Sequence, residues 1–272
     1  MAPIDLFAAA LAALCEADPA AKAARARALH EAWAQGRVEM ADAGAPPALL
    51  VPGRPARPTL VAPQAVPRRS PASRLGHAAL LHALAHIEFN AINLALDAAY
   101  RFRGLPADFY GDWLKVAAEE ALHFSLLREH LQTLGHDYGD FPAHDGLWEM
   151  ALKTAGDPLA RMALVPRVLE ARGLDAAPAI RAKLTRIGDA RAVELLELIE
   201  RDEIGHVAIG SRWYSYLCRA RGVAPREAFR VLLEQYGAPP LNPPFNFAAR
   251  SRAGFDAEEL AWLHDLQAGA VH

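Results

Sequence analysis

The sequence lacks most of the features that mark secreted, nucleic-acid-binding or membrane proteins. It holds only two cysteines in 272 residues, Cys15 and Cys218, far apart and each without a cysteine neighbour. This pattern excludes a disulfide framework and fits a reducing compartment, so we expect a cytoplasmic protein. The net charge of -3 gives no overall nucleic-acid signature. No uncharged apolar run reaches the roughly 20 residues of a membrane-spanning helix, and we expect no membrane span.

Strand signals are also lacking, and the sequence predicts an all-α protein. Hydrophobic residues make up 53% of the chain, and alanine and leucine, both good helix formers, are frequent. Long helices are predicted at about residues 74–102, 107–134, 158–187 and 190–220. Two shorter helices, separated by Asp18-Pro19, are predicted within residues 1–43. Others are predicted near 147–153 and 225–236, and from Asp256, where Glu259 completes a capping box.

Residues 44–73 contain no acidic side chain and eight prolines. Arg54, Arg57, Arg68 and Arg69 make this segment basic. So many prolines exclude a helix and favour extended chain. A disordered linker is one interpretation; the interleaved Leu60, Val61 and Val66 favour a strap packed along the rest of the protein.

The most informative pattern is a Glu-x-x-His motif that occurs twice. Its copies are Glu120 with His123 and Glu203 with His206. Single glutamates precede the copies at similar distances: Glu88 lies 32 residues before Glu120, and Glu170 lies 33 residues before Glu203. Because helix residues three apart share a face, each motif places a carboxylate beside an imidazole. Two such pairs with two single glutamates make up the ligand set of ferritin-like two-metal bundles.

These six side chains lie among apolar neighbours, for example Leu84, Ile92, Val168 and Ile199. A buried carboxylate must be paired or bind a cation, because an unpaired buried charge costs several kcal/mol. The four carboxylates carry four negative charges, which two divalent ions would balance. Glu119 and Asp202 precede the histidines by four residues and are candidates to orient the histidine of the opposite motif. Solvent-facing charges are the alternative for both.

Helix connections predict the topology. The first and second long helices are joined by a short turn, as are the third and fourth, whereas residues 135–156 form a long middle connection. One crossover between two antiparallel hairpins is typical of ferritin-like four-helix bundles. We therefore expect a bundle over residues 74–220 with a long crossover, an N-terminal helical extension (1–43), a proline-rich strap (44–73) and a C-terminal helical extension (221–272) packed on the bundle.

The third long helix contains residues that disturb helices. Pro166 should bend it, and Gly173 and Pro178 should break or kink it. Counted from the turn at 1.5 Å per residue, Glu170 and Glu203 differ in height by roughly 6 Å. We expect the kink between Gly173 and Pro178 to absorb this difference.

Other side chains carry weaker signals. Core or loop-fixing hydrogen bonds are the expected role of His82, His86, His136 and His144. Core positions are expected for Trp113, Trp148, Trp213, Tyr110 and Tyr214. Arg172 could pair with a carboxylate or bind an anionic substrate, and the sequence does not separate these roles.

With these residues identified, residues 74–220 resemble the ferritin-like superfamily of carboxylate-bridged di-iron proteins. More closely, nearly the whole chain resembles an uncharacterised bacterial ferritin-like family. The segments that carry this second resemblance are His86-Ile87-Glu88, Pro142-Ala143-His144-Asp145-Gly146-Leu147-Trp148-Glu149, Leu169-Glu170-Ala171-Arg172-Gly173-Leu174-Asp175, Pro244-Phe245-Asn246 and Ala248-Ala249-Arg250.

The resemblance implies that Glu88, Glu120 and His123 hold one metal and Glu170, Glu203 and His206 the other, with Glu120 and Glu203 bridging. The cofactors would be two Fe ions, with Mn as the alternative, and the activity an oxygen-activating hydroxylase, desaturase or oxidase of unknown substrate. Expected partners are dioxygen, a small-molecule or other substrate, an electron donor and, as a homodimer, a second copy of the chain. Alternatives are iron handling, a metal-stabilised binding protein without turnover, and a tRNA-modifying hydroxylase.

Overall fold

A computed structural model describes residues 3–41, 44 and 46–269 of the chain. The chain divides into two compact units, Met1–Glu149 and Met150–His272, each described by itself below. The described residues are all-α except for one parallel pair of two-residue strands, β1 (Ile4–Asp5) and β2 (Val38–Glu39). The outermost ends of the predicted extensions, residues 1–2 and 270–272, lie outside the described residues, as do residues 42–43 and 45.

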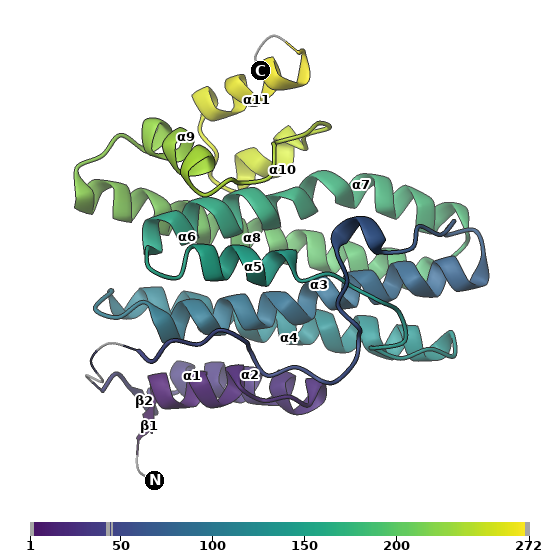
Figure 1. The fold of residues 1–272 in the computed structure, drawn as a ribbon, viewed down its shortest axis with the longest axis horizontal. Helices are drawn as coiled ribbons and strands as arrows, with labels where there is room; N and C mark the ends of the chain where they lie inside the picture. Colours follow the sequence, from purple (N-terminus) through teal and green to yellow (C-terminus); the bar gives the residue numbers. More distant parts are fainter. Residues whose placement is uncertain (1–2, 42–43, 45, 270–272) are drawn as a thin grey trace. The chain divides into compact units, whose positions relative to one another are not determined.

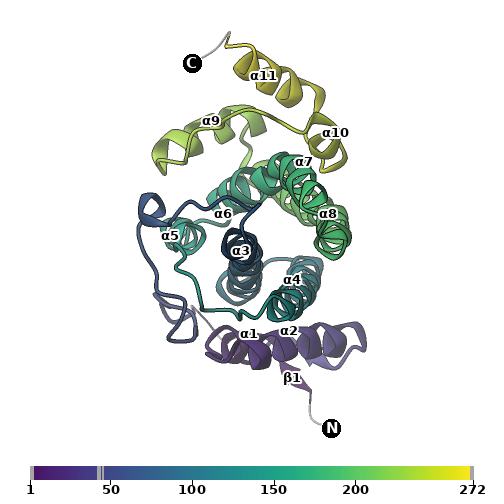
Figure 2. The same cartoon turned by 90° about the vertical axis from the view of Figure 1, so that its right-hand side faces the viewer.

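The first unit is built on a helical hairpin of α3 (Arg74–Arg101) and α4 (Ala107–Thr133), which lie side by side in both views (Figures 1 and 2). Ser73 caps α3 by accepting a hydrogen bond from the Gly76 N–H at 3.1 Å. The turn between the helices uses Gly104, whose φ of +72° is in the left-handed region. The predicted bounds of both helices are confirmed to within one residue.

Two N-terminal helices, α1 (Leu6–Leu14) and α2 (Pro19–Ala34), pack against this hairpin (Figure 2). The predicted break between them is confirmed, since Asp18 caps α2 and Pro19 occupies its first position. Lys22 is fully buried and donates hydrogen bonds to the last carbonyl groups of α1, at Ala13 and Leu14.

The proline-rich segment is tied to the connection that follows α4. Its backbone exchanges hydrogen bonds with Ala143, through the Thr59 carbonyl and the Val61 N–H. Arg54 forms a 2.9 Å ion pair with Asp145, and the Trp148 indole N–H donates to the Leu50 carbonyl at 2.9 Å. A single 3-10 turn, η1, covers Pro63–Ala65. Between Leu50 and Val61 the segment is thus held against the connection that follows α4.

Helix α3 is long and apolar enough to cross a membrane by length and composition alone. In its most apolar window, 72% of the residues are buried inside the protein. A core helix passes the same test, so this finding is weak evidence for a membrane span.

The second unit contains α6 (Pro158–Leu164), a π-helical segment η2 (Val165–Glu170), α7 (Ala171–Arg186) and α8 (Ala190–Arg221). Asp157 caps α6 by accepting from the Leu159 N–H at 2.8 Å. Gly188, with φ of +79°, makes the turn before α8. Helix α5 (Gly146–Lys153) spans the junction of the two units in the sequence.

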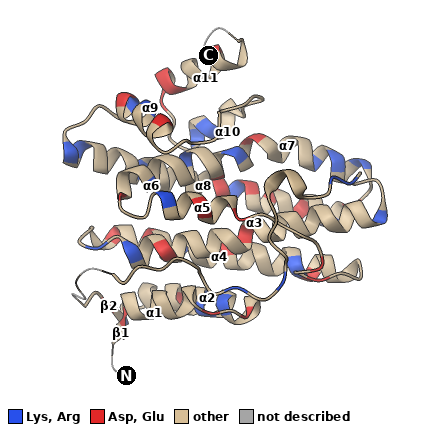
Figure 3. Ribbon diagram, in the orientation of Figure 1, with Lys and Arg blue, Asp and Glu red and all other residues tan. Residues whose placement is uncertain are grey.

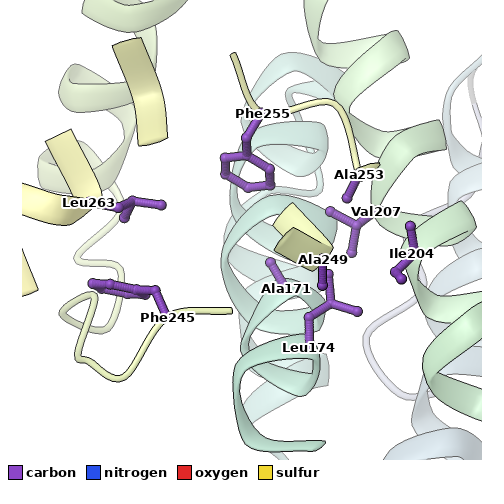
Figure 4. Packing of buried hydrophobic residues seen from close by; sticks show 9 residues of the cluster. All are labelled: Ala171, Leu174, Ile204, Val207, Phe245, Ala249, Ala253, Phe255 and Leu263. Atoms are coloured by element: carbon purple, nitrogen blue, oxygen red, sulfur yellow. The ribbon is translucent and has the colours of Figure 1, made fainter. Parts of the chain in front are cut away.

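The C-terminal helices are α9 (Pro225–Gln235), α10 (Phe247–Arg252) and α11 (Ala257–Gln267). Helix α9 packs on α6 and α8, α10 packs on α7 and α8, and α11 packs on α10. The capping box predicted between Asp256 and Glu259 is present. Figure 4 shows Ala249 of α10 beside Ala171 and Leu174 of α7 and Val207 of α8, in one buried cluster. Arg250, which follows Ala249 in the sequence, forms a bidentate, buried ion pair with Asp175 at 2.9 and 2.7 Å. The separate α10 was not predicted.

The predicted break between Gly173 and Pro178 is wrong. Helix α7 runs unbroken through both positions, and the irregular turn lies earlier, at η2, which contains Pro166. Pro178 has no N–H to donate to the Leu174 carbonyl, but the Asn246 side-chain amide donates to that oxygen at 3.2 Å. This substitute donor satisfies the carbonyl group and allows the helix to continue.

Candidate metal centre

Three of the predicted ligands converge inside the first unit: Glu88 of α3 with Glu120 and His123 of α4. The Nδ1 atom of His123 lies 3.2 Å from Oε2 of Glu88 and 3.4 Å from Oε2 of Glu120. One ligand atom from each of the three lies within 4.8 Å of the other two. All three side chains are buried, Glu120 and His123 completely. The buried cluster formed by these three residues could bind a metal ion.

Helix geometry explains this convergence. Glu120 and His123 are three residues apart and share one face of α4, and Glu88 faces them from the paired helix α3. Fully buried apolar residues such as Ala85, Ile92 and Leu127 lie one or two turns away along the same two helices. The hairpin thereby places two carboxylates and an imidazole close to buried apolar side chains.

The electrostatics of the cluster favour a cation. Burial, and after it the negative charge of Glu120, raise the pKa of Glu88 to about 8, although His123 acts in the opposite direction. Two acids held this close in the core repel each other unless a proton or a metal ion lies between them. Carboxylate oxygens with an imidazole nitrogen are donors that both Fe and Mn accept. The side chains in this unit therefore fit a divalent ion.

The second unit brings two of its three predicted ligands together. The Nδ1 atom of His206 lies 3.7 Å from Oε1 of Glu203, again across one face of a helix, α8. Glu170 is the last residue of η2. Among the described residues of this unit alone, no three ligand atoms lie within 4.8 Å of one another. The grouping of Glu170 with Glu203 and His206 therefore stays a prediction.

Both histidines present Nδ1 to the glutamate of their own motif, which leaves Nε2 for an outer partner. Each of the two acids predicted for that role contacts a basic neighbour. Glu119 accepts from Lys115 at 2.9 Å, and Asp202 accepts from Arg201 at 3.0 Å. These contacts do not test whether either acid orients the histidine of the opposite motif, so that role stays a prediction.

A second polar cluster in the first unit joins α3 to the loop after α4. Nδ1 of His86 lies 2.9 Å from the Tyr138 hydroxyl, and its Nε2 lies 3.0 Å from both the His144 carbonyl oxygen and the Asn90 amide. His82 accepts a hydrogen bond from the Gly139 N–H at 2.9 Å. Burial lowers the pKa of both histidines to about 4, so they are neutral at pH 7. Their expected role in core hydrogen bonding is confirmed.

Tyr138 is the residue of this cluster that the sequence did not single out. Its ring packs against Phe89 and Phe124, at centroid distances of 5.2 and 5.1 Å. These phenylalanines directly follow Glu88 and His123 in the sequence. Tyr138 therefore supports the two helices at the level of the metal ligands. In the sequence, the only indication of a fixed position was that Tyr138 begins the segment Tyr-Gly-Asp-Phe-Pro, which is typical of a turn.

Arg172 and the aromatic residues have structural roles in the described residues. Arg172 donates to the Asn242 carbonyl at 2.7 Å and lies 3.8 Å from Asp175, so pairing with a carboxylate accounts for its position. The five aromatic residues expected in the core are buried, namely Trp113, Trp148, Trp213, Tyr110 and Tyr214.

Basic and acidic residues are mixed within both units. Arg54 of the basic strap is paired with Asp145. Figure 3 shows basic and acidic positions interspersed along the helices in each unit rather than separated by sign.

Comparison with known proteins identifies a family without an assigned activity. The family model described as "Protein of unknown function (DUF455)" matches residues 15–261. A protein of Haemophilus influenzae, described as an uncharacterized protein, is 53% identical over 220 residues, which cover 78% of this chain and 76% of that protein. No solved structure matches this chain. The expectation of a family of unknown function is thus confirmed, and its ferritin-like fold stays a prediction.

Proposed function

The chain belongs to the family described as Protein of unknown function (DUF455), and from this premise we propose that it is an oxygen-activating oxidoreductase with a two-metal centre. The observation that carries the proposal is the buried cluster of Glu88, Glu120 and His123. A protein core holds two adjacent carboxylates beside an imidazole at a high electrostatic cost, which a bound dication removes.

The proposal assigns one ion to Glu88, Glu120 and His123 and the other to Glu170, Glu203 and His206. In this assignment Glu120 and Glu203 would serve both ions, and Glu119 and Asp202 would orient the histidines. This assignment requires the ligands of the two units to face one centre, as they do in a ferritin-like bundle. The repeated motif supports it, because each unit contributes a Glu-x-x-His pair with the same Nδ1-to-carboxylate arrangement.

Two bound ferrous ions would supply the electrons that reduce dioxygen and so drive a hydroxylation, desaturation or oxidase reaction. The side chains hold the ions, keep water out and set the charge of the site. Glu88 can carry a proton when the site is empty and release it on metal binding, because its pKa is raised to about 8. The electron donor and the cytoplasmic location are further parts of the proposal.

Metal stoichiometry tests the proposal. The full chain, freed of metal and titrated with ferrous iron without oxygen, should bind two ions. Glu120→Gln on α4 and Glu203→Gln on α8 should each lose at least one of them. The matched controls are Glu129→Gln and Glu197→Gln, which change exposed glutamates on the same two helices and should keep both ions. A wild-type chain that binds no iron, or four variants that behave alike, would rule out the proposed site.

The oxygen step requires a second measurement. The iron-loaded chain should consume dioxygen and change its visible absorbance, and a zinc-loaded sample should do neither. Two bound ions without oxygen consumption would identify a metal-stabilised binding protein instead. Continued uptake of iron beyond two ions by a large assembly would identify iron handling, and retention of tRNA by the loaded chain would favour a tRNA-modifying enzyme.

A further inference from the structure

Glu170, the predicted ligand that completes the second half of the site, stands at the end of an unusual turn. In η2 the Ala171 N–H donates to the Pro166 carbonyl oxygen, five residues earlier, which is the π-helical pattern. Pro166 itself has no N–H for the ordinary helical bond to residue 162. Wide turns of this kind are uncommon and occur often at functional sites.

The direction of the Glu170 side chain depends on this turn. Successive residues of an α-helix are rotated by about 100° around its axis, because one turn takes 3.6 residues. A π-turn accommodates one extra residue. If η2 became regular α-helix, Glu170 would therefore be rotated by about 100° around the helix axis relative to α6. The carboxylate would then leave the face on which the wide turn presents it.

Two contacts of the second unit hold the turn. On one side, Pro166 packs against Gly210 of α8. On the other, Arg167 forms a very short ion pair with Glu259 of α11, and both side chains are nearly buried, at 3% and 12% exposed. The Arg167 guanidinium also lies over the rings of Tyr214 and Phe255, at 4.8 and 4.7 Å.

Glu259 contacts both the beginning of α11 and η2. One of its carboxylate oxygens accepts from the Asp256 N–H at 2.9 Å in the capping box that begins α11, and the other pairs with Arg167 of η2. An unfavourable backbone conformation persists only where its surroundings over-determine it. A buried ion pair suits that task, because the loss of one partner leaves the other charge uncompensated in the core.

We propose that the ion pair between Arg167 and Glu259 is a positioning contact, which keeps η2 in its wide turn and so aims Glu170 at the metal. The inference rests on the proposed role of Glu170 as a ligand. It assigns a function to the C-terminal extension, which the sequence alone left without one: α11 stabilises the geometry of the proposed metal ligand at the end of η2.

The test uses Glu259→Gln in the full chain, because glutamine can keep the capping-box hydrogen bond while it removes the charge. The matched control is Glu258→Gln, which changes the adjacent, exposed glutamate that pairs with Arg226. Arg167→Met combined with Glu259→Gln is a second variant, in which no buried charge is left unpaired. Two quantities are measured: hydrogen exchange of the amides of residues 165–171, and the affinity for ferrous iron.

We expect Glu259→Gln and the double variant to speed exchange in residues 165–171 and to weaken iron binding about tenfold, as supporting contacts of metal ligands do. Glu258→Gln should change neither quantity. When Glu170→Gln is already present, Glu259→Gln should cause no further loss of iron, because the same ligand has been removed.

The outcomes separate this inference from the proposed function. If the wild-type chain binds no iron, the proposed function fails, and hydrogen exchange still shows whether the ion pair holds η2. If iron binding is normal in wild type and unchanged by Glu259→Gln, the positioning role is wrong. Additive losses from Glu259→Gln and Glu170→Gln would also overturn it, because they would show that Glu259 acts on stability and not through Glu170.

Discussion

A Cβ atom placed on Gly210 would lie 2.3 Å from both Cβ and Cγ of Pro166. Real carbon atoms do not approach so closely, so α8 can pass η2 at this distance only because position 210 has no side chain. Gly210 therefore fixes how near α8, which carries Glu203 and His206, lies to the turn that carries Glu170.

Gly210→Ala should destabilise the protein by about 1–3 kcal/mol, because the added methyl group must push Pro166 or the α8 backbone aside. Gly173→Ala is the matched control, on an exposed site of α7 where a new Cβ meets nothing within 4 Å. That variant should gain up to about 1 kcal/mol from helix propensity. Urea unfolding of both variants measures the difference, and effects of the same sign would contradict the close packing of Gly210.

The hydrogen bond from Asn246 to the Leu174 carbonyl predicts a coupling with Pro178. Asn246→Ser keeps an oxygen to cap α10 but is too short to reach Leu174, and should cost about 1 kcal/mol. In a Pro178→Ala background the new N–H at position 178 can bond the same carbonyl, so Asn246→Ser should cost about 0.5–1 kcal/mol less. Equal costs in the two backgrounds, measured by denaturant unfolding, would show that Asn246 does not compensate for the proline.

Local signals predicted much of the helical structure. Asp18-Pro19, Asp157-Pro158 and the Asp256–Glu259 pair each begin a helix through contacts within a few residues, which the sequence displays directly. The unbroken α7 could not be predicted in this way. Its proline is tolerated because of a donor 68 residues later in the chain, at Asn246, and such a contact exists only in the folded state.

The contact between Tyr138 and His86 predicts a loss of stability without a loss of packing. Tyr138→Phe removes the hydroxyl that lies 2.9 Å from the imidazole, while the ring remains against Phe89 and Phe124. We expect a loss of about 1 kcal/mol in the free energy of unfolding. Tyr236→Phe serves as a control, because the Tyr236 hydroxyl makes no hydrogen bond among the described residues, and it should stay near the wild-type value. A wild-type stability for Tyr138→Phe would contradict a structural role for the hydroxyl.

The candidate site was predictable where helix periodicity decides it. Spacing alone places Glu120 beside His123, and equal distances to the hairpin turn bring Glu88 to their level. The second half was harder, because an irregular turn of backbone precedes Glu170 and no periodicity describes it. The contact of Arg167 with Glu259 joins positions 92 residues apart, and the capping box that contains Glu259 does not indicate it.

The pKa of Glu88 predicts how the metal-free protein responds to pH. The ordinary value of 4.5 applies in the unfolded chain, whereas burial, followed by the charge of Glu120, raises it to about 8 in the folded chain. Between these values the folded state holds a proton that the unfolded state has released. Stability is therefore full below about pH 4.5 and falls as the pH rises toward about 8. Glu88→Gln removes this ionisation and should remove that loss.

The comparison with Glu88→Gln is needed because His82 and His86 act in the opposite direction. Their pKa values are lowered from 6.5 to about 4, so their contribution to stability grows as the pH rises through that interval. The wild type and Glu88→Gln both contain these histidines, so the difference between their melting temperatures reports the contribution of Glu88 alone. Without metal, that difference should grow in favour of Glu88→Gln from about pH 5 to 8. Saturating ferrous iron should reverse its sign, because the ion replaces the proton only where the carboxylate is present. If the difference in melting temperature changes with neither pH nor iron, Glu88 has no raised pKa in the folded protein and is not a metal ligand.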